Sequence, residues 1–167
     1  MNTFDMAFKE VLGIEGGYVD DKNDNGGETK YGISKRSYPN VDIKNLTLDG
    51  AKEIYYKDFW NTKRLELSLI DDETIALELF DTSVNMGIIT ASKFLQEALN
   101  LMNRNQADWN DLVVDGFCGV ETFMAYKKAR KDILLKVLNG LQFCKYKAIC
   151  EKNPNQEVFF NGWMKRV

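Results

Sequence analysis

The chain has 167 residues, of which 44% are apolar and 28% charged, a balance typical of globular proteins rather than disordered or membrane proteins. The formal net charge is −3 and histidine is absent, which excludes Ser-His-Asp and Cys-His catalysis and His-ligated metal sites. Acid–base chemistry in this protein must therefore use carboxylates, lysine, tyrosine or cysteine.

Charge is distributed unevenly along the chain. Residues 1–126 hold 12 basic and 22 acidic side chains, a net −10, whereas residues 127–167 hold 10 basic and 3 acidic ones, a net +7. The basic side chains alternate with apolar ones at helical spacing, so we interpret them as the solvated face of a long helix. We therefore expect no nucleic-acid partner.

The three cysteines, Cys118, Cys144 and Cys150, contain no CxxC pair, so we expect reduced thiols without a zinc site or disulfides. No stretch approaches the roughly eighteen apolar residues of a membrane span, so we expect no membrane insertion. Residues 1–10 include acids and lack the regions of a secretory signal. We expect synthesis in the cytoplasm and a holin-type or specialised export route to the periplasm or cell wall.

The hydrophobic pattern predicts a mainly α fold. A first helix with one apolar face is expected to end at Gly16-Gly17. Residues 16–30 are rich in Gly, Asp and Asn and predict a long structured loop or a short β-hairpin.

Later helices are predicted from apolar residues at helical spacing and from their caps. They are expected over about 48–60 after a cap at Thr47, from Asp71-Asp72 to Gly87, from a cap at Thr90 through Met102, and over about 120–151. The last stretch is expected to break at Asn139-Gly140 and to close before Pro154.

Glu15 interrupts the apolar face of the first helix. Helical steps from Phe4 through Phe8 and Leu12 lead to this carboxylate, which stands directly before Gly16-Gly17. Burial and the helix dipole would both raise its pKa, and the glycines would let a ligand approach closely. A carboxylic acid protonated near neutral pH can act as a general acid. The alternative is a glutamate at a frayed helix end that points to solvent.

The following loop adds Asp20, Asp21, Asp24 and Thr29. Two carboxylates, one acid and one base or charge stabiliser, form the minimal machinery of glycoside hydrolysis. Turn formation is the alternative role of these aspartates.

A calcium loop is a second interpretation of this segment. Asp21, Asn23, Asn25 and Gly26 match positions 1, 3, 5 and 6 of the EF-hand pattern. The match fails at Gly32, where the pattern needs a bidentate carboxylate. We expect neither a metal site nor a cofactor, and a calcium-binding helical protein stays an alternative.

Residues 15–34, EGGYVDDKNDNGGETKYGIS, resemble the signature of glycoside hydrolase family 108, N-acetylmuramidases that include phage-type lysozymes and secretion activators. LFDTSVNMG (79–87) is similar to the family's Asp-x-x-x-Asn-x-Gly helix, and GWMKR (162–166) to its closing Gly-Trp-x-x-Arg. FLQEAL (94–99) and VDGFCGVET (114–122) resemble its C-terminal predicted peptidoglycan-binding segment.

This resemblance implies a lysozyme-like fold that cleaves the β-1,4 bond between N-acetylmuramic acid and N-acetylglucosamine in peptidoglycan glycan strands. The family's catalytic glutamate corresponds to Glu15. Phage lysozymes of a related fold place an Asp and then a Thr behind this Glu. Asp24 matches the spacing of that Asp, and Thr29 falls one residue short of that Thr. We expect Asp24 to stabilise positive charge or orient water, and Thr29 to position water.

Four more residues are candidate substrate contacts. Tyr18 and Tyr31, in or beside the glycine-rich loop, are expected to contact sugar rings. Asp81 and Asn85, four residues apart on one helix face, either bond sugar amides or satisfy polar groups in a helical core.

We predict a catalytic lobe over residues 1–90 and a peptidoglycan-binding helical segment over 91–167 that packs on it, in a monomeric chain. The favoured function is a peptidoglycan hydrolase. The alternative is a catalytically silent peptidoglycan-binding or secretion-accessory module that keeps the lysozyme-like fold.

Overall fold

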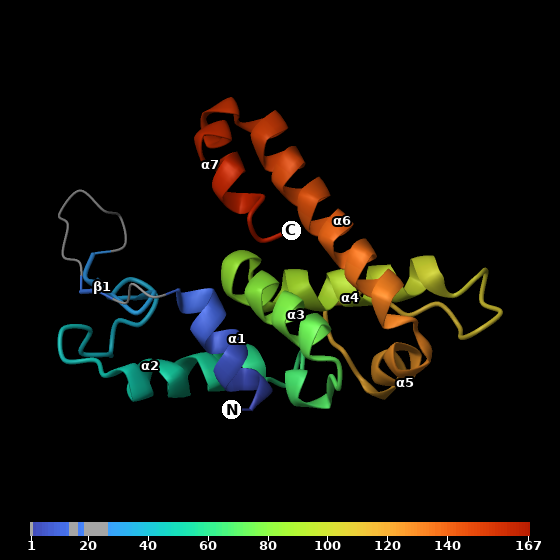
Figure 1. Ribbon diagram of the computed structural model, residues 1–167, viewed down its shortest axis with the longest axis horizontal. Helices are drawn as coiled ribbons and strands as arrows, with labels where there is room; N and C mark the ends of the chain where they lie inside the picture. The colour runs from blue at the N-terminus through green and yellow to red at the C-terminus, as the bar shows by residue number, and fades with distance from the viewer. Residues whose placement is uncertain (1, 14–16, 19–26) are drawn as a thin grey trace. The chain divides into compact units, whose positions relative to one another are not determined.

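The computed structural model describes residues 2–13, 17–18 and 27–167 (Figure 1). Within these ranges the chain has seven α-helices and one two-stranded hairpin, which confirms the predicted mainly α fold. The chain forms two compact units, Met1–Trp60 and Asn61–Val167. None of the described helices is long and apolar enough to cross a membrane.

Helix α1 (Thr3–Leu12) opens the N-terminal unit. The Asn2 side chain caps it by accepting a hydrogen bond from the backbone N–H of Asp5 at 2.8 Å. Gly13 ends it with a φ of +64°, a conformation that favours glycine. The predicted end at Gly16-Gly17 is therefore wrong, because an earlier glycine stops the helix.

A small hairpin follows. Strand β1 (Thr29–Lys30) pairs antiparallel with β2 (Ile33–Ser34), with Thr29 opposite Ser34. Its turn residues, Tyr31 and Gly32, have φ values of +51° and +73°, and positive φ at both positions is typical of a type I′ turn. The hairpin alternative for this part of the chain is confirmed.

Helix α2 (Leu48–Tyr55) packs its aromatic face on α1. Thr47 caps it through a 3.1 Å hydrogen bond from the backbone of Gly50, as predicted. The helix continues as one π-helical turn, η1 (Tyr56–Trp60). Phe8 meets the ring of Tyr55 edge-on at 5.4 Å, and Phe4 lies 5.3 Å from the ring of Trp60. Aromatic contacts of this kind supply much of the core of a small unit.

In the C-terminal unit, a short 3-10 turn, η2 (Leu67–Leu69), precedes α3 (Glu73–Met86). The helix starts behind Asp71-Asp72 and ends at Gly87, as predicted, and the Asp72 side chain caps it. Helix α4 (Ile88–Met102) begins directly behind Gly87, so the predicted cap at Thr90 is wrong. The Thr90 hydroxyl instead donates to the carbonyl of Met86 at 2.9 Å, as threonine does inside helices.

The last predicted stretch forms two helices, α5 (Val120–Lys128) and α6 (Lys131–Lys152). The break lies at Ala129, which is extended, and not at Asn139-Gly140, which α6 contains. The ammonium group of Lys131 stabilises this break by donating to the carbonyls of Tyr126 and Ala129. A short 3-10 turn, η3 (Pro154–Gln156), and α7 (Glu157–Trp163) complete the chain.

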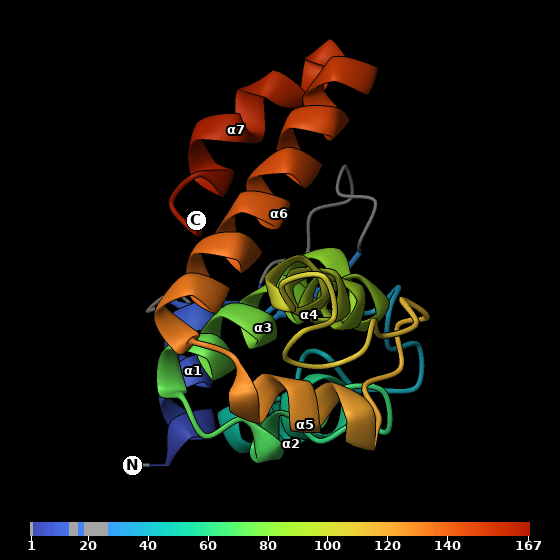
Figure 2. The ribbon, with the colours of Figure 1, turned by 90° about the vertical axis from the view of Figure 1, so that its right-hand side faces the viewer.

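These helices form a layered bundle around α3. Helix α3 packs on both α4 and α6, and α7 runs back alongside α6 (Figures 1 and 2). The closing GWMKR segment thereby returns to α3, because Arg166 pairs with Asp81.

We predict that Gly32→Ala strongly destabilises the N-terminal unit. A Cβ at this position would lie 2.4 Å from the hydroxyl oxygen of Tyr55, in a backbone conformation with positive φ. Strain and overpacking together should lower the free energy of unfolding by about 2–4 kcal/mol. Thermal melting measures the loss, with Gly17→Ala as the control because nothing lies within 4 Å of a Cβ there. Equal melting of both variants would refute the close approach of Tyr55.

Candidate functional site

The turn of the hairpin is anchored to α2. The hydroxyl of Tyr55, a buried residue, donates to the carbonyl of Tyr31 at 3.2 Å. Burial raises the pKa of Tyr55, so the hydroxyl keeps its proton and remains a donor. This contact fixes Tyr31, a predicted sugar contact, at a defined place on the N-terminal unit.

Tyr18 and Glu28 join the two ends of the aspartate-rich loop. The Tyr18 hydroxyl donates to a carboxylate oxygen of Glu28 at 2.8 Å, and the ring of Tyr18 remains partly exposed. Sequence reasoning missed Glu28, although a carboxylate between Gly27 and Thr29 in the longest motif was a signal for it.

The structure describes only one of the three predicted catalytic residues. Glu15 and Asp24, as well as Asp20 and Asp21, lie outside the described residues. Thr29 lies in β1, where its hydroxyl donates to the carbonyl of Gly27 at 3.4 Å. Thr29 opens the hairpin and Tyr31 lies in its turn. Glu28 directly precedes the hairpin and bonds to Tyr18.

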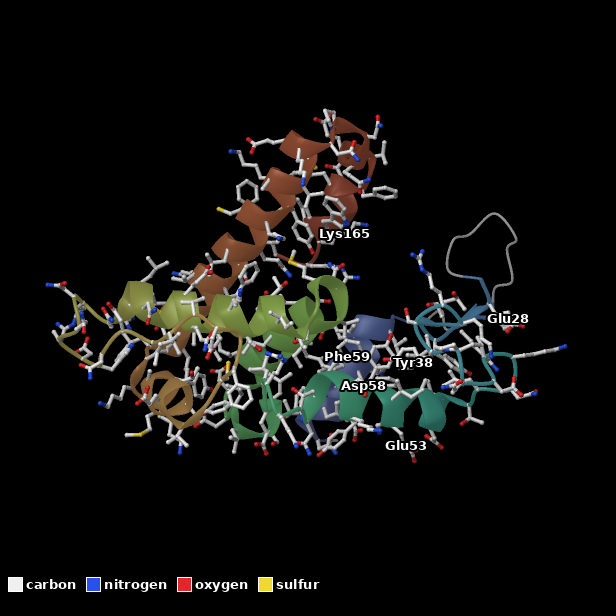
Figure 3. The ribbon with its side chains drawn as sticks, turned by 180° about the vertical axis from the view of Figure 1, so that it is seen from behind. Glu28, Tyr38, Glu53, Asp58, Phe59 and Lys165 are labelled. Atoms are coloured by element: carbon white, nitrogen blue, oxygen red, sulfur yellow. The ribbon has the colours of Figure 1, made fainter. Side chains whose placement is uncertain are left out.

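A second polar pair lies between the hairpin region and η1. Tyr38 donates to the carboxylate of Asp58 at 2.9 Å, and Figure 3 shows the two side chains on adjacent elements. Burial, followed by the hydrogen bond to Asp58 and then by the charge of that carboxylate, raises the pKa of Tyr38 well above its usual value. Tyr38 is therefore a fixed neutral donor and not a proton carrier near neutral pH.

Asp81 and Asn85 both find partners inside the C-terminal unit. Asp81 forms an ion pair with Arg166, and the Asn85 amide donates to the hydroxyl of Tyr146. Trp163 stacks on the ring of Tyr146 at 4.9 Å. The motifs LFDTSVNMG and GWMKR, far apart in sequence, therefore meet at one place.

Glu78, one turn before Asp81 and Thr82, is a buried acid that sequence reasoning missed. The Thr82 hydroxyl donates to its Oε1 at 3.2 Å, and the Gln142 amide donates to the same hydroxyl. Burial, and then repulsion by Asp81, raises the pKa of Glu78 to about 7, although the Thr82 bond opposes the shift. The available signal was a glutamate on the apolar face of α3.

The two segments that resemble a peptidoglycan-binding pattern form one local structure. The Gln96 amide nitrogen donates to Asp115 Oδ1 at 2.9 Å and to the carbonyl of Phe117 at 3.1 Å. Its amide oxygen accepts the backbone N–H of Gly116 at 2.9 Å. One side chain of α4 therefore holds the VDGFCGVET turn in place.

Cysteine and metal chemistry are limited in the described part of the chain. All three cysteines are free, and Cys118 and Cys150 are buried. Burial raises the pKa of the Cys118 thiol to about 12, so it is not a nucleophile near neutral pH. Residues 2–13, 17–18 and 27–167 contain no group of three or more potential metal ligands.

Comparisons with known proteins divide the chain into two parts. The family model described as Glycosyl hydrolase 108 matches residues 8–87, and the one described as Predicted Peptidoglycan domain matches residues 90–167. Among solved structures, the chain is similar to that of Brucella abortus SagA, with 25% identity and a TM-score of 0.71. The match covers 98% of this chain and 88% of that chain, and it supports the predicted lysozyme-like fold class. No curated protein matches the chain.

We predict that Glu78→Gln changes how stability depends on pH. The carboxyl group titrates near 4.5 when unfolded and near 7 when folded, so the native state binds the extra proton between these values. Stability from this group is present below about pH 4.5 and is lost as pH rises through about 7. Relative to the wild type, Glu78→Gln should gain about 2–3 kcal/mol between pH 5 and pH 8.

Urea unfolding at these two pH values measures that difference. Glu97→Gln, on α4, is the control and should show no comparable gain. A constant difference between Glu78→Gln and the wild type would contradict the burial of a protonated Glu78.

Proposed function

Because the chain belongs to the glycosyl hydrolase 108 family and carries a predicted peptidoglycan domain, we propose that it is an N-acetylmuramidase. It cleaves the β-1,4 bond between N-acetylmuramic acid and N-acetylglucosamine. The observation that carries this proposal is the family match over residues 8–87, which contains the Glu15-Gly16-Gly17-Tyr18 motif. The bond between Tyr18 and Glu28, which joins this motif to the hairpin, supports it.

Glu15 is the general acid in this proposal. It follows the end of α1 by three residues and precedes two glycines, so the backbone beside it carries no side chain to obstruct a sugar. Protonation of the glycosidic oxygen by a carboxylic acid lets the leaving sugar depart as a neutral alcohol. The chain has no histidine, so a carboxyl group is the natural donor.

Asp24 is the second carboxylate, and Thr29 positions water. Asp24 stands nine residues behind Glu15 in the sequence, between Tyr18 and Glu28, whose side chains are in contact. A carboxylate there stabilises the positive charge that develops on the anomeric carbon, or activates water. Glu28 orients the Tyr18 ring as a positioning residue, and Tyr18 and Tyr31 then contact the sugar.

A catalytically silent binding module is the second candidate. The ordered Gln96–Asp115 structure within the predicted peptidoglycan domain favours it, because this part can hold a ligand without chemistry elsewhere. In either case we place the site of action at the periplasm or cell wall, reached by a holin-type or specialised route. Clearing of purified cell walls separates the two candidates.

We predict that Glu15→Gln abolishes wall clearing. The amide preserves the volume of the side chain but has no acidic proton to transfer, so the rate should fall at least about a hundredfold. Turbidity measures the rate, and the melting temperature should stay unchanged. Glu10→Gln, an exposed carboxylate on α1, is the matched control and should remain active. More than about a tenth of the wild-type rate in a folded Glu15→Gln variant would rule out this role.

We further predict that Asp24→Asn lowers kcat, but less than Glu15→Gln does. Asparagine preserves the shape and removes the charge, so a residue that only forms a turn should tolerate it. Asp20→Asn and Asp21→Asn are the controls, measured on the same walls. A normal kcat for Asp24→Asn, together with a loss in either control, would assign the second carboxylate elsewhere.

A further inference from the structure

The base of the hairpin is tied to the helical turn that follows α2. The Tyr38 hydroxyl donates to Oδ2 of Asp58 at 2.9 Å, and Figure 3 shows both side chains. The backbone N–H of Tyr38 donates to the carbonyl of Ser34, the last residue of β2, at 2.9 Å. Ser34 is paired with Thr29, the residue proposed to position water. Asp58 is therefore linked to Thr29 through Tyr38 and β2.

A second set of contacts begins one residue behind Ser34. The backbone N–H of Lys35 donates to the carbonyl of Glu28 at 2.8 Å. The Glu28 carboxylate in turn accepts the hydroxyl of Tyr18, a proposed sugar contact. A displacement of the residues that follow β2 would therefore change the surroundings of both Thr29 and Tyr18.

Asp58 stands in an unusual helical turn. The turn η1 is π-helical over Tyr56–Trp60, and single π-helical turns are rare and frequently lie at functional sites. Because burial and then the bond to Asp58 raise the pKa of Tyr38, its hydroxyl keeps the proton that it donates. The Tyr38–Asp58 bond therefore forms throughout the range near neutral pH.

Apolar burial alone does not fix the orientation of the hairpin. Ile33 of β2 is 1% exposed and holds the strand on the core, but apolar contacts are not directional. The bond from Tyr55 to Tyr31 fixes the turn. The Tyr38–Asp58 bond adds a second directional contact with the same helical segment, beyond the other end of β2. Two such contacts orient a short strand, whereas one leaves it free to turn.

We infer that Asp58 is a positioning residue, which acts through Tyr38 to hold the base of the hairpin, and with it Thr29, where the reaction requires them. Asp58 supplies an acceptor oxygen for Tyr38 and does not itself touch the substrate. Misplacement of a group by about 1 Å can slow a reaction about a hundredfold, so loss of the bond should lower kcat. Tyr31 is held separately by Tyr55, so KM should change little. The inference rests on the proposed function, since it takes wall hydrolysis as the reaction.

Four variants of the full chain test this inference, through initial rates of wall clearing at several wall concentrations. Tyr38→Phe and Asp58→Ala each remove the bond and should lower kcat at least about tenfold, with KM within about twofold. The double variant should lose no more than either single variant, because both changes remove the same bond. Asp58→Asn should keep kcat within about twofold of the wild type, because its amide oxygen still accepts the Tyr38 hydroxyl.

Tyr56→Phe is the matched control and should behave as the wild type. Tyr56 lies in the same π-helical turn, is exposed, and has no hydrogen-bond partner for its hydroxyl among the residues that the structure describes. Rates are measured below the melting temperature of every variant, so that a loss of stability alone leaves kcat unchanged. A loss in Asp58→Asn equal to that in Asp58→Ala would show that the charge of Asp58 acts directly in the chemistry, and would overturn the inference.

Amide hydrogen exchange separates this inference from the proposed function. The backbone N–H of Lys35, bonded to the Glu28 carbonyl, should exchange at least about fivefold faster in Tyr38→Phe than in the wild type. The N–H of Ala51, bonded to the carbonyl of Thr47 at the start of α2, is the control and should not change. Faster exchange in a protein whose wild type does not clear walls would overturn the proposed activity while supporting this contact. Wall clearing by the wild type, with normal kcat or unchanged exchange in Tyr38→Phe, would overturn the inference alone.

Discussion

The hydrogen bond from Tyr55 to the carbonyl of Tyr31 is the contact on which the N-terminal unit depends. An isolated two-stranded hairpin is marginal in water, and this one has only two residues in each strand. The contact ties the hairpin to α2, and it requires Gly32 because a Cβ there would collide with the Tyr55 hydroxyl. This contact therefore explains why position 32, in the segment that resembles the family signature, is a glycine. The proposed chemistry of the preceding loop relies on this support.

The C-terminal unit depends on the polar face of α3. Glu78, Asp81 and Asn85 lie along one side of the helix. Glu78 has its partner within α3, Asp81 at the end of the chain, and Asn85 in α6. Buried polar groups are costly unless they are paired, so these contacts fix how the helices pack.

The sequence predicts those features whose causes are local. The cap at Thr47, the helix start at Asp71-Asp72 and the helix end at Gly87 were identifiable because each signal acts within a few residues of itself. Gly13 and Gly16 can each end a helix, and composition alone does not decide which of them ends α1. The break at Ala129 depends on the side chain of Lys131. The partners of Asp81 and Asn85 lie 85 and 61 residues away, beyond the reach of any periodicity. For the candidate site, the motif indicated Tyr18 and Tyr31, but only the structure shows that Glu28 bonds to Tyr18.

Mass spectrometry of the muropeptides released from purified cell walls tests the central claim most directly, because each new reducing end identifies the bond that was cut. The account predicts fragments that end in reducing N-acetylmuramic acid, produced by the wild type and absent with Glu15→Gln. Fragments that end in reducing N-acetylglucosamine, or that arise only by peptide cleavage, would contradict it.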